Sequence, residues 1–313
     1  MKNYSQFTLK KYFIVLILIQ FNVFNNVYAA EVSAKTEKCY QALDKGDLSK
    51  AIAISDDVLK SESNNREGLL CKGRALGASG KYGEALSALE LAEKQSQPGF
   101  DKIIATIFIG NLHKDNKRNV EAIASYEKSL KICESEKNDK FKRINLNLIG
   151  ETQVANKDYN AALSSYLSGA KLAMNDNERA DGYERLAFTY GSLGQYDSAI
   201  EYQLKGVLMQ QKSGTLDQYA NASLALGQIY GQAKDYVNAE NTYSKLIQFS
   251  KDNGGVYYES KASYGLAQTK VMAGDSANAK TIMSDALTLA KNSGERDLVA
   301  EIEASLNKLN NSR

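Results

Sequence analysis

Few residues in this sequence have the chemistry of a catalytic centre. The chain of 313 residues contains one histidine, His113, together with three cysteines and no tryptophan. A zinc site usually takes four His or Cys ligands, and a Ser-His-Asp triad would have to use His113 as its base. Phosphate-loop, dinucleotide-binding and HExxH motifs are also absent from the sequence. We therefore expect no catalytic site, metal or cofactor, and expect His113 to be a packed or half-buried side chain.

The three cysteines, Cys39, Cys71 and Cys133, allow at most one internal disulfide. Cys39 and Cys71 fall on corresponding segments of the chain, so a bridge between them is geometrically feasible. Buried free thiols are the commoner state for such residues, and this is the state that we expect. Cys133 has no evident mate.

The charge of the chain argues against a nucleic-acid partner. There are 39 Lys and Arg residues against 37 Asp and Glu residues, a net charge of +2. No stretch combines clustered basic residues with interleaved aromatic ones. Residues 1–29 carry three lysines and no acid, so without them 39 − 3 = 36 basic residues face 37 acidic ones.

Residues 1–29 have the pattern of a secretory signal peptide. Lysines precede an apolar run at 13–19, and Val27 and Ala29 stand at the −3 and −1 positions of a cleavage site. The alternative is an uncleaved anchor, but a spanning helix needs about 20 predominantly apolar residues, and Gln20 and three later asparagines interrupt this run. We expect cleavage after Ala29, export to the periplasm or secretion, and no stable membrane insertion afterwards.

The elements that would position any functional side chain recur along the chain. An alanine returns at intervals of 34 to 40 residues, at Ala51, Ala85, Ala122, Ala162, Ala199, Ala239 and Ala279. Twelve residues before each alanine is a small side chain: Cys39, Gly73, Gly110, Gly150, Ala187, Gly227 and Ala267. Four residues after each alanine stand Ser55, Leu89, Tyr126, Tyr166, Gln203, Tyr243 and Met283. Each copy of this pattern is predicted to form two antiparallel helices joined by a short turn.

The most regular copies read LAFTYGSLGQYDSAIEYQLKG (186–206) and LGQIYGQAKDYVNAENTYSKL (226–246). This pattern resembles the tetratricopeptide repeat family, and its long repeats are similar to those of kinesin light chains. The resemblance covers about 32–293 and implies an all-α, right-handed solenoid of about seven helix-turn-helix repeats plus a C-terminal capping helix. The family's tryptophan is absent, and its usual proline appears only near Pro98.

These features predict the domain organisation. The repeats are expected at 32–65, 66–102, 103–142, 143–179, 180–219, 220–259 and 260–293, within a solenoid over 30–293. The small residue of each first helix should face the alanine of the second, while tyrosines and leucines fill the gaps between repeats. Residues 294–313 should form a capping helix and tail, because Leu298, Ile302, Leu306 and Leu309 share one helical face.

In this family the first helices line a concave groove, so the resemblance places candidate partner-binding residues there. They are Arg74, Asn111, Asn147, Glu151, Glu184, Phe188, Gln228 and Tyr264. The lysine and asparagine clamp with which some members hold C-terminal carboxylates is absent. Phe188 is the expected anchor, because packing does not require an aromatic residue at that position. The alternatives are that Phe188 packs against the neighbouring first helix and that the polar residues are merely solvated.

The resemblance implies a non-catalytic periplasmic scaffold that binds a peptide or protein segment in its groove. An accessory or sensory subunit of an envelope secretion, pilus or polysaccharide export system is the alternative. A peptide-sensing regulator fits less well, because such proteins typically begin with a DNA-binding domain and this chain begins with a signal-like segment. An enzyme is disfavoured because nearly every residue belongs to a repeat.

Overall fold

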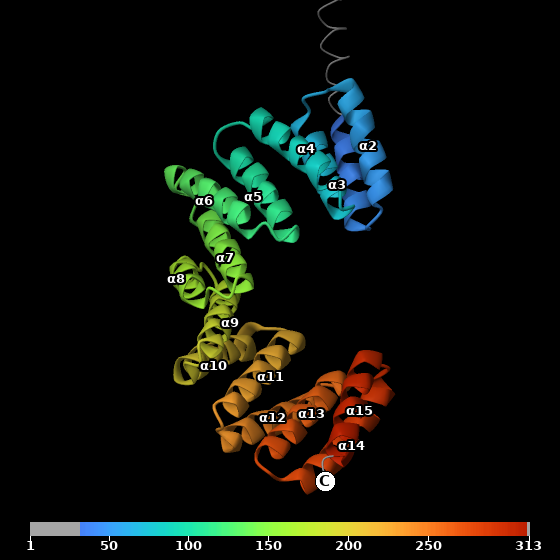
Figure 1. Ribbon diagram of the computed structural model, residues 1–313, viewed down its shortest axis with the longest axis vertical. Coiled ribbons are helices and arrows are strands. Elements are labelled where there is room, and N and C mark those ends of the chain that lie inside the picture. The colour runs from blue at the N-terminus through green and yellow to red at the C-terminus, as the bar shows by residue number, and fades with distance from the viewer. Residues whose placement is uncertain (1–31, 312–313) are drawn as a thin grey trace, which may run out of the picture. The chain divides into compact units, whose positions relative to one another are not determined.

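The computed structural model describes residues 32–311, which contain fifteen helices and no strand (Figure 1). A helix over 32–44 is followed by α2 (Leu48–Ser61), α3 (Arg66–Ala78), α4 (Tyr82–Gln95), α5 (Phe100–Asp115), α6 (Asn119–Ser135), α7 (Asp139–Ala155) and α8 (Tyr159–Ala170). The remaining helices are α9 (Asp176–Ser192), α10 (Tyr196–Ser213), α11 (Leu216–Gln232), α12 (Tyr236–Asp252), α13 (Val256–Met272), α14 (Ser276–Ser293) and α15 (Arg296–Asn311). The all-α repeat fold predicted from the sequence is confirmed. The predicted signal peptide, 1–29, lies outside the described residues.

The helices form two compact units, which meet between Asn138 and Asp139. Unit 1 holds repeats 1 to 3, made by the helix 32–44 with α2, α3 with α4, and α5 with α6. Unit 2 holds repeats 4 to 7, from α7 with α8 to α13 with α14, and ends with α15. Within each unit every helix packs on the next, and α3 contacts α5 as α11 contacts α13. First helices of neighbouring repeats thus lie side by side in both units.

The turn inside each repeat has a fixed backbone conformation. The residue five positions before the recurring alanine has a positive φ in every repeat, at Gly46, Gly80, Lys117, Lys157, Gly194, Lys234 and Gly274. The next residue is the N-cap that precedes the second helix, and in four repeats it is an aspartate. Asp158 and Asp235, for example, accept a hydrogen bond from the backbone N–H three residues on. A glycine or lysine followed by a helix cap thus ends one helix and begins the next.

Packing inside a repeat depends on the residue four positions after the alanine. In three repeats a tyrosine ring lies against a glycine of the first helix: Gly110 with Tyr126, Gly150 with Tyr166, and Gly227 with Tyr243. A Cβ atom on any of these glycines would lie 2.4–2.5 Å from a ring carbon, so only glycine permits this approach. The small residue faces the alanine as expected in repeats 1 and 2: the Cys39 Sγ lies 3.1 Å from the backbone oxygen of Ala51, and a Cβ on Gly73 would lie 3.2 Å from that of Ala85. The methyl group of Ala85 lies beside Gly77, one turn further along the first helix.

A disulfide joins Cys39 to Cys71 in unit 1, with Cα atoms 6.3 Å apart. It connects the helix 32–44 to α3, and both residues are fully buried. The expectation of buried free thiols is wrong for this pair, because neighbouring first helices bring the two Cα atoms within the range that a disulfide spans. Cys133 is buried in α6 and takes no part in this bridge.

The last helix, α15, covers the end of repeat 7. Leu298 and Ile302 are buried against α14, and the hydroxyls of Tyr264 and Ser305 are 2.7 Å apart across α13 and α15. This is the capping role predicted from its apolar face. Within residues 32–311, none of the helices has both the length and the apolar character that a membrane span requires.

Candidate functional site

In unit 1, the predicted groove residues Arg74 and Asn111 are held by aromatic neighbours. The guanidinium carbon of Arg74 lies 5.6 Å from the centroid of the Tyr40 ring and 4.8 Å from that of Phe108. Asn111 accepts a hydrogen bond of 2.7 Å from the Tyr126 hydroxyl. Both residues line a pocket of ≈ 340 Å³ between α3 and α5. Arg74 is thus sandwiched between rings, an arrangement in which cation–π attraction fixes its position.

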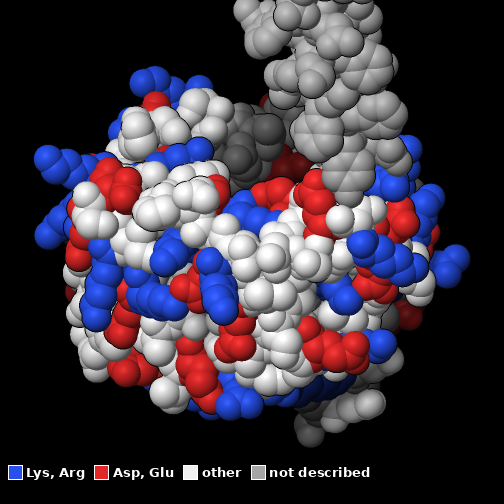
Figure 2. Space-filling view, turned by 90° about the horizontal axis from the view of Figure 1, so that it is seen from above, with Lys and Arg blue, Asp and Glu red and all other residues white. Residues whose placement is uncertain are grey.

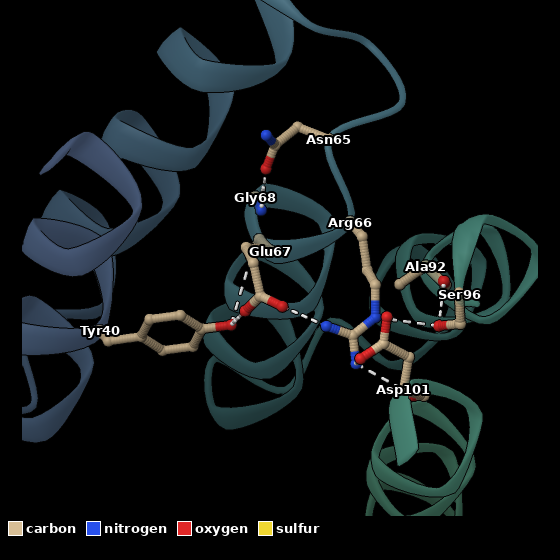
Figure 3. Close-up of polar contacts among 8 residues, drawn as sticks. All are labelled: Tyr40, Asn65, Arg66, Glu67, Gly68, Ala92, Ser96 and Asp101. Atoms are coloured by element: carbon tan, nitrogen blue, oxygen red, sulfur yellow. Dashed lines mark hydrogen bonds and ion pairs between the residues drawn. The ribbon is translucent and has the colours of Figure 1, made fainter. Parts of the chain in front are cut away.

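A second arginine of unit 1, Arg66, connects three helices (Figure 3). Its Nε donates to the Ser96 hydroxyl at 3.0 Å, and its terminal nitrogens contact Glu67 and the backbone oxygen of Asp101. The Tyr40 hydroxyl donates to the same Glu67 at 2.7 Å, and burial and this carboxylate raise the pKa of Tyr40. The network joins the starts of α3 and α5 to the end of α4, and its Tyr40 ring also contacts the predicted groove residue Arg74.

In unit 2, ion pairs hold the groove residues at the junction of α7 and α9. Arg185 contacts Glu151 at 2.7 Å and Asp181 at 3.0 Å, and its guanidinium carbon lies 5.7 Å from the centroid of the Tyr166 ring. Burial lowers the pKa of Arg185, but its hydrogen bonds to the two carboxylates outweigh this and raise it overall. The amide of the buried Asn147 is 3.5 Å from Asp181. The structure therefore brings Asn147 and Glu151 together through Asp181 and Arg185, two residues that the sequence analysis did not select.

Arg143 of α7 occupies the same repeat position as Arg66, seven residues before the small residue. It pairs with Glu178 at 3.0 Å and with Asp181 at 3.8 Å. Glu178 in turn occupies the position of Asp101, nine residues before the small residue of the next repeat. This recurring arginine–acid pair was not predicted, because it lies outside the packing positions and the inner row from which the repeats and the groove were predicted. Its fixed spacing is nevertheless visible in the sequence.

Phe188 is exposed at 57% of its surface and borders a pocket of ≈ 300 Å³ between α9 and α11. Glu184, Gln203, Asn221 and Gln228 also line this pocket. The alternative that Phe188 is packed away against the neighbouring helix does not fit this exposure. Phe188, Glu184 and Gln228 are thus three predicted residues that the structure places around one cavity.

Two further pockets adjoin the exposed Gln228 toward the end of unit 2. One of ≈ 470 Å³ lies among α11, α13 and α15, with Met272, Met283 and Leu309 in its wall. The other, of ≈ 420 Å³, is lined by Tyr243, Gln268 and the predicted residue Tyr264. Tyr264 itself is only 6% exposed and is bonded to Ser305. The inner face of α9, α11 and α13 is therefore hollowed at several adjoining places.

Comparisons with known proteins identify the repeats. Two segments match models of the tetratricopeptide repeat: residues 107–136 in unit 1 and residues 178–252 in unit 2. The chain is a tetratricopeptide repeat (TPR) protein. Outer dynein arm-docking complex subunit 4 of Bos taurus is 23% identical over 185 residues, which are 58% of this chain and 27% of that protein. The chain thus matches little more than a quarter of that relative's length.

Solved structures share the fold. The crystal structure of the apo form of RapI has a TM-score of 0.69 at 14% identity, covering 90% of this chain and 82% of that one. Kinesin-light-chain-like repeats of Podosopora anserina have a TM-score of 0.52 at 14% identity, covering 61% of this chain and 97% of that one. At these identities the likeness concerns the TPR fold alone.

Electrostatics distinguish the residues around the Phe188 pocket of the TPR protein. Burial raises the pKa of Glu184, opposed by a hydrogen bond from the Gln210 side chain. Glu184 is the one charged residue among those that line this pocket. The wall of the cavity therefore carries an acid and no cation.

His113 is a packed residue of repeat 3. It is 9% exposed, its Nδ1 lies 2.9 Å from the Tyr82 hydroxyl, and burial lowers its pKa. This is the state that the sequence analysis expected. Over residues 32–311 no group of three or more His, Cys, Asp or Glu side chains is placed to hold a metal ion.

The charged surface of the TPR protein is mixed where Figure 2 displays it. Lys and Arg side chains are interspersed with Asp and Glu side chains over the visible face. A nucleic-acid-binding face usually shows basic residues gathered in a patch or stripe, and the described residues on this face lack that pattern.

Proposed function

We propose that this TPR protein is an exported, non-catalytic scaffold that binds a peptide or protein segment on the inner face of unit 2. Helical repeats of this kind commonly use the face lined by their first helices to hold extended partners. The site that we propose is formed by α9, α11 and α13, where three pockets adjoin one another around Gln228.

The exposed Phe188 carries this proposal. Phe188 is 57% exposed on a helix whose other apolar residues are packed. Its ring therefore leaves apolar surface in contact with water, which is unfavourable unless a partner covers it. Aromatic residues beside concave pockets are the usual anchors of protein interfaces. The exposed Gln228 and Asn221 beside it supply amide groups that can bond a peptide backbone.

Export to an oxidising compartment is supported by two independent features. Residues 1–29 have the pattern of a signal peptide. The disulfide between Cys39 and Cys71 is of a kind found mainly in exported proteins, because cytosolic thiols are kept reduced, and it therefore supports the proposed export. Intact-mass measurement of the protein from an envelope fraction tests this proposal, which requires loss of residues 1–29 and the mass of an oxidised cysteine pair.

Binding is tested with partners captured from an envelope extract by the purified chain. The affinity of a captured partner should fall by about tenfold for Phe188→Ala, as expected when an aromatic anchor is truncated. Lys245→Ala, at an exposed position on the second helix α12, is the matched control and should leave affinity unchanged. Equal affinities for both folded variants would exclude the inner face as the site.

A further inference from the structure

Within unit 2, tyrosine rings fill two of the junctions between neighbouring first helices. The Tyr243 ring lies against Gly227 of α11 and Gly265 of α13. The Tyr166 ring lies against Gly150 of α7 and beneath Arg185 of α9. A ring supplied by the second helix thus fills two of the three junctions between first helices in unit 2.

The junction of α9 with α11 has no such ring. The tyrosine position is occupied by Gln203, and the glycine that would receive the ring is Ala187. The two replacements match in size, because a Cβ on the glycine would collide with a tyrosine, whereas Ala187 is accommodated beside the thinner glutamine. The pocket of ≈ 300 Å³ lies at this junction, with Gln203 and Ala187 in its wall.

The wall of the pocket contains a polar group that is almost completely buried. Gln203 is 2% exposed, and its Nε2 donates to the backbone oxygen of Ala222 on α11 at 2.9 Å. This bond engages Nε2, while the Oε1 of the same amide is an acceptor, and Gln203 is one of the residues that line the pocket. Phe188 stands at the mouth and remains 57% exposed. The cavity therefore combines an aromatic rim with an acceptor in its wall.

We propose that this pocket receives a tyrosine side chain from the partner, supplied by a segment with basic residues next to that tyrosine. The proposal rests on the binding function proposed above and specifies its ligand. The incoming ring enters the cavity beside Ala187 and Gln203. It does not take the exact place of the Tyr166 and Tyr243 rings, because the Cβ of Ala187 and the Gln203 side chain exclude a ring there. Its hydroxyl donates to Oε1 of Gln203, and its face packs against Phe188.

Charge complementarity selects the residues next to the tyrosine. Glu184 is the one charged residue in the pocket wall, so the wall carries an acid and no cation. A lysine or arginine next to the bound tyrosine would form a charge-assisted hydrogen bond with this carboxylate. An acidic neighbour would instead be repelled.

The probes are four synthetic tripeptides with blocked ends: Lys-Tyr-Lys, Lys-Phe-Lys, Lys-Leu-Lys and Glu-Tyr-Glu. Each is titrated into the full chain while the side-chain amide of Gln203 and the backbone amides of α9 and α11 are followed by NMR. Lys-Tyr-Lys should bind most tightly and shift the Gln203 amide. Lys-Leu-Lys and Glu-Tyr-Glu should each be weaker by about tenfold, from loss of ring burial and of charge pairing respectively. The affinity of Lys-Phe-Lys should lie between that of Lys-Tyr-Lys and that of the two weaker peptides, because it lacks only the hydroxyl.

A filling variant tests the pocket from the side of the protein. Ala187→Gly with Gln203→Tyr recreates the pair that repeat 6 forms with Gly227 and Tyr243, so the chain's own ring should occupy the cavity. Affinity for Lys-Tyr-Lys should fall by about tenfold or more, with an unchanged circular dichroism spectrum. Gln211→Tyr, at an exposed position of the same helix, is the matched control and should bind as the unmodified chain does.

Three results would overturn the pocket proposal: equal binding of all four probes, no binding of Lys-Tyr-Lys, or undiminished binding by the folded filling variant. The comparison of probes uses the unmodified chain, so it decides the matter even where the filling variant does not fold. Failure here while Phe188→Ala still weakens a captured partner would remove this ligand and leave the scaffold function intact. Binding of Lys-Tyr-Lys without any effect of Phe188→Ala on captured partners would exclude the inner-face scaffold instead.

Discussion

Units 1 and 2 are built from the same repeat, but they use its variable positions in different ways. In unit 1, a disulfide and a polar network of five residues around Arg66 connect successive helices, and Arg74 is enclosed by two rings. In unit 2, the inner face is open around Gln228, and Phe188 remains exposed beside a cavity. The variable residues of unit 1 therefore connect its repeats to one another, while those of unit 2 leave a cavity with room for a ligand.

The equivalent arginines show what this difference depends on. Arg66 and Arg143 stand at the same repeat position and both contact an acid of the next repeat. Arg66 also donates from its Nε to Ser96, whereas the buried Nε of Arg143 finds no acceptor among the described residues. Repeat position thus determines which residues meet, and the neighbouring side chains determine how completely their polar groups are satisfied.

Removing the disulfide should have the largest effect and should act on unit 1. Cys39 and Cys71 are separated by 32 positions, and a loop of this length corresponds to about 3–4 kcal/mol of the free energy of unfolding. Cys39→Ser with Cys71→Ser should therefore weaken hydrogen-exchange protection in the helix 32–44, α2 and α3. Protection in α11–α13 serves as the internal control and should not change. Equal loss of protection in both units would contradict their independence.

Replacing the equivalent arginines should have the next largest effect. The stability of unit 1 should depend more on the contact of Arg66 with its acids than the stability of unit 2 depends on that of Arg143. Arg66→Met should lower the free energy of unfolding of unit 1 by about 2–3 kcal/mol, because it leaves partly buried carboxylates unpaired. Arg143→Met should cost unit 2 about 1–2 kcal/mol, because the methionine also removes the unsatisfied Nε. Urea titration followed by hydrogen exchange measures both. A larger cost for Arg143 would reverse the comparison.

The recurring alanines should behave alike in the two units. Ala122→Trp in unit 1 and Ala239→Trp in unit 2 place a large ring where both alanines are fully buried. Each should lower the free energy of unfolding by roughly 1–3 kcal/mol through overpacking. Lys245→Trp, at an exposed position, should stay within about ±0.5 kcal/mol. Thermal unfolding of the three variants measures the difference, and equal tolerance at all three positions would mean that the repeat phase is wrong.

Replacing the lysines with a positive φ by glycine should stabilise the protein in both units. Lys117 in unit 1 and Lys157 in unit 2 adopt the left-handed conformation that glycine occupies in repeats 1, 2, 5 and 7. Replacing either by glycine removes the steric cost of a Cβ and should raise the free energy of unfolding by about 0.5–1 kcal/mol after the added entropy of the unfolded chain. The same change at the helical position Lys205 should be destabilising. Differential scanning calorimetry distinguishes the two outcomes.

Glu184→Gln should have the smallest effect on stability, confined to unit 2. Because burial raises the pKa of Glu184 in the folded state, the folded chain holds the proton more tightly than the unfolded chain does. The stability that this contributes is present below the unfolded pKa and is lost as pH rises through the folded one. Glutamine should therefore give a gain below about 0.5 kcal/mol at pH 7 and none at pH 3. A gain that is equal at both values would exclude titration of Glu184 as the cause.

The sequence predicts the fold well because the fold follows from local rules. The recurring alanines, the turn residues and the aspartates after them determine where helices begin and end, and these signals need no knowledge of distant contacts. One feature of the candidate site was also predictable from the sequence, namely the exposure of Phe188. This residue lies one position after the small residue of its first helix, where packing between the helices does not require an aromatic side chain.

Other features of the site depend on pairs of residues in different repeats. Asp181 and Arg185 lie outside the inner row that was followed in the sequence, yet they hold Glu151 and Asn147 in place. The disulfide likewise depends on how closely two neighbouring helices approach. The Gln203 pocket depends on a tyrosine that is missing, which becomes evident only when the rings of other repeats are seen to fill the same junction.

The position of the disulfide along the chain affects the order of assembly. Both cysteines lie within the first 71 of 313 residues. In a chain that enters an oxidising compartment N-terminus first, these thiols arrive while every residue of unit 2 is still to follow. Under the export that we propose, the bridge would close around repeat 1 and the beginning of repeat 2 before later helices could compete for their surfaces. Since each repeat contacts only its neighbours, this covalently closed pair would offer a fixed template on which the remaining repeats dock in their order of arrival.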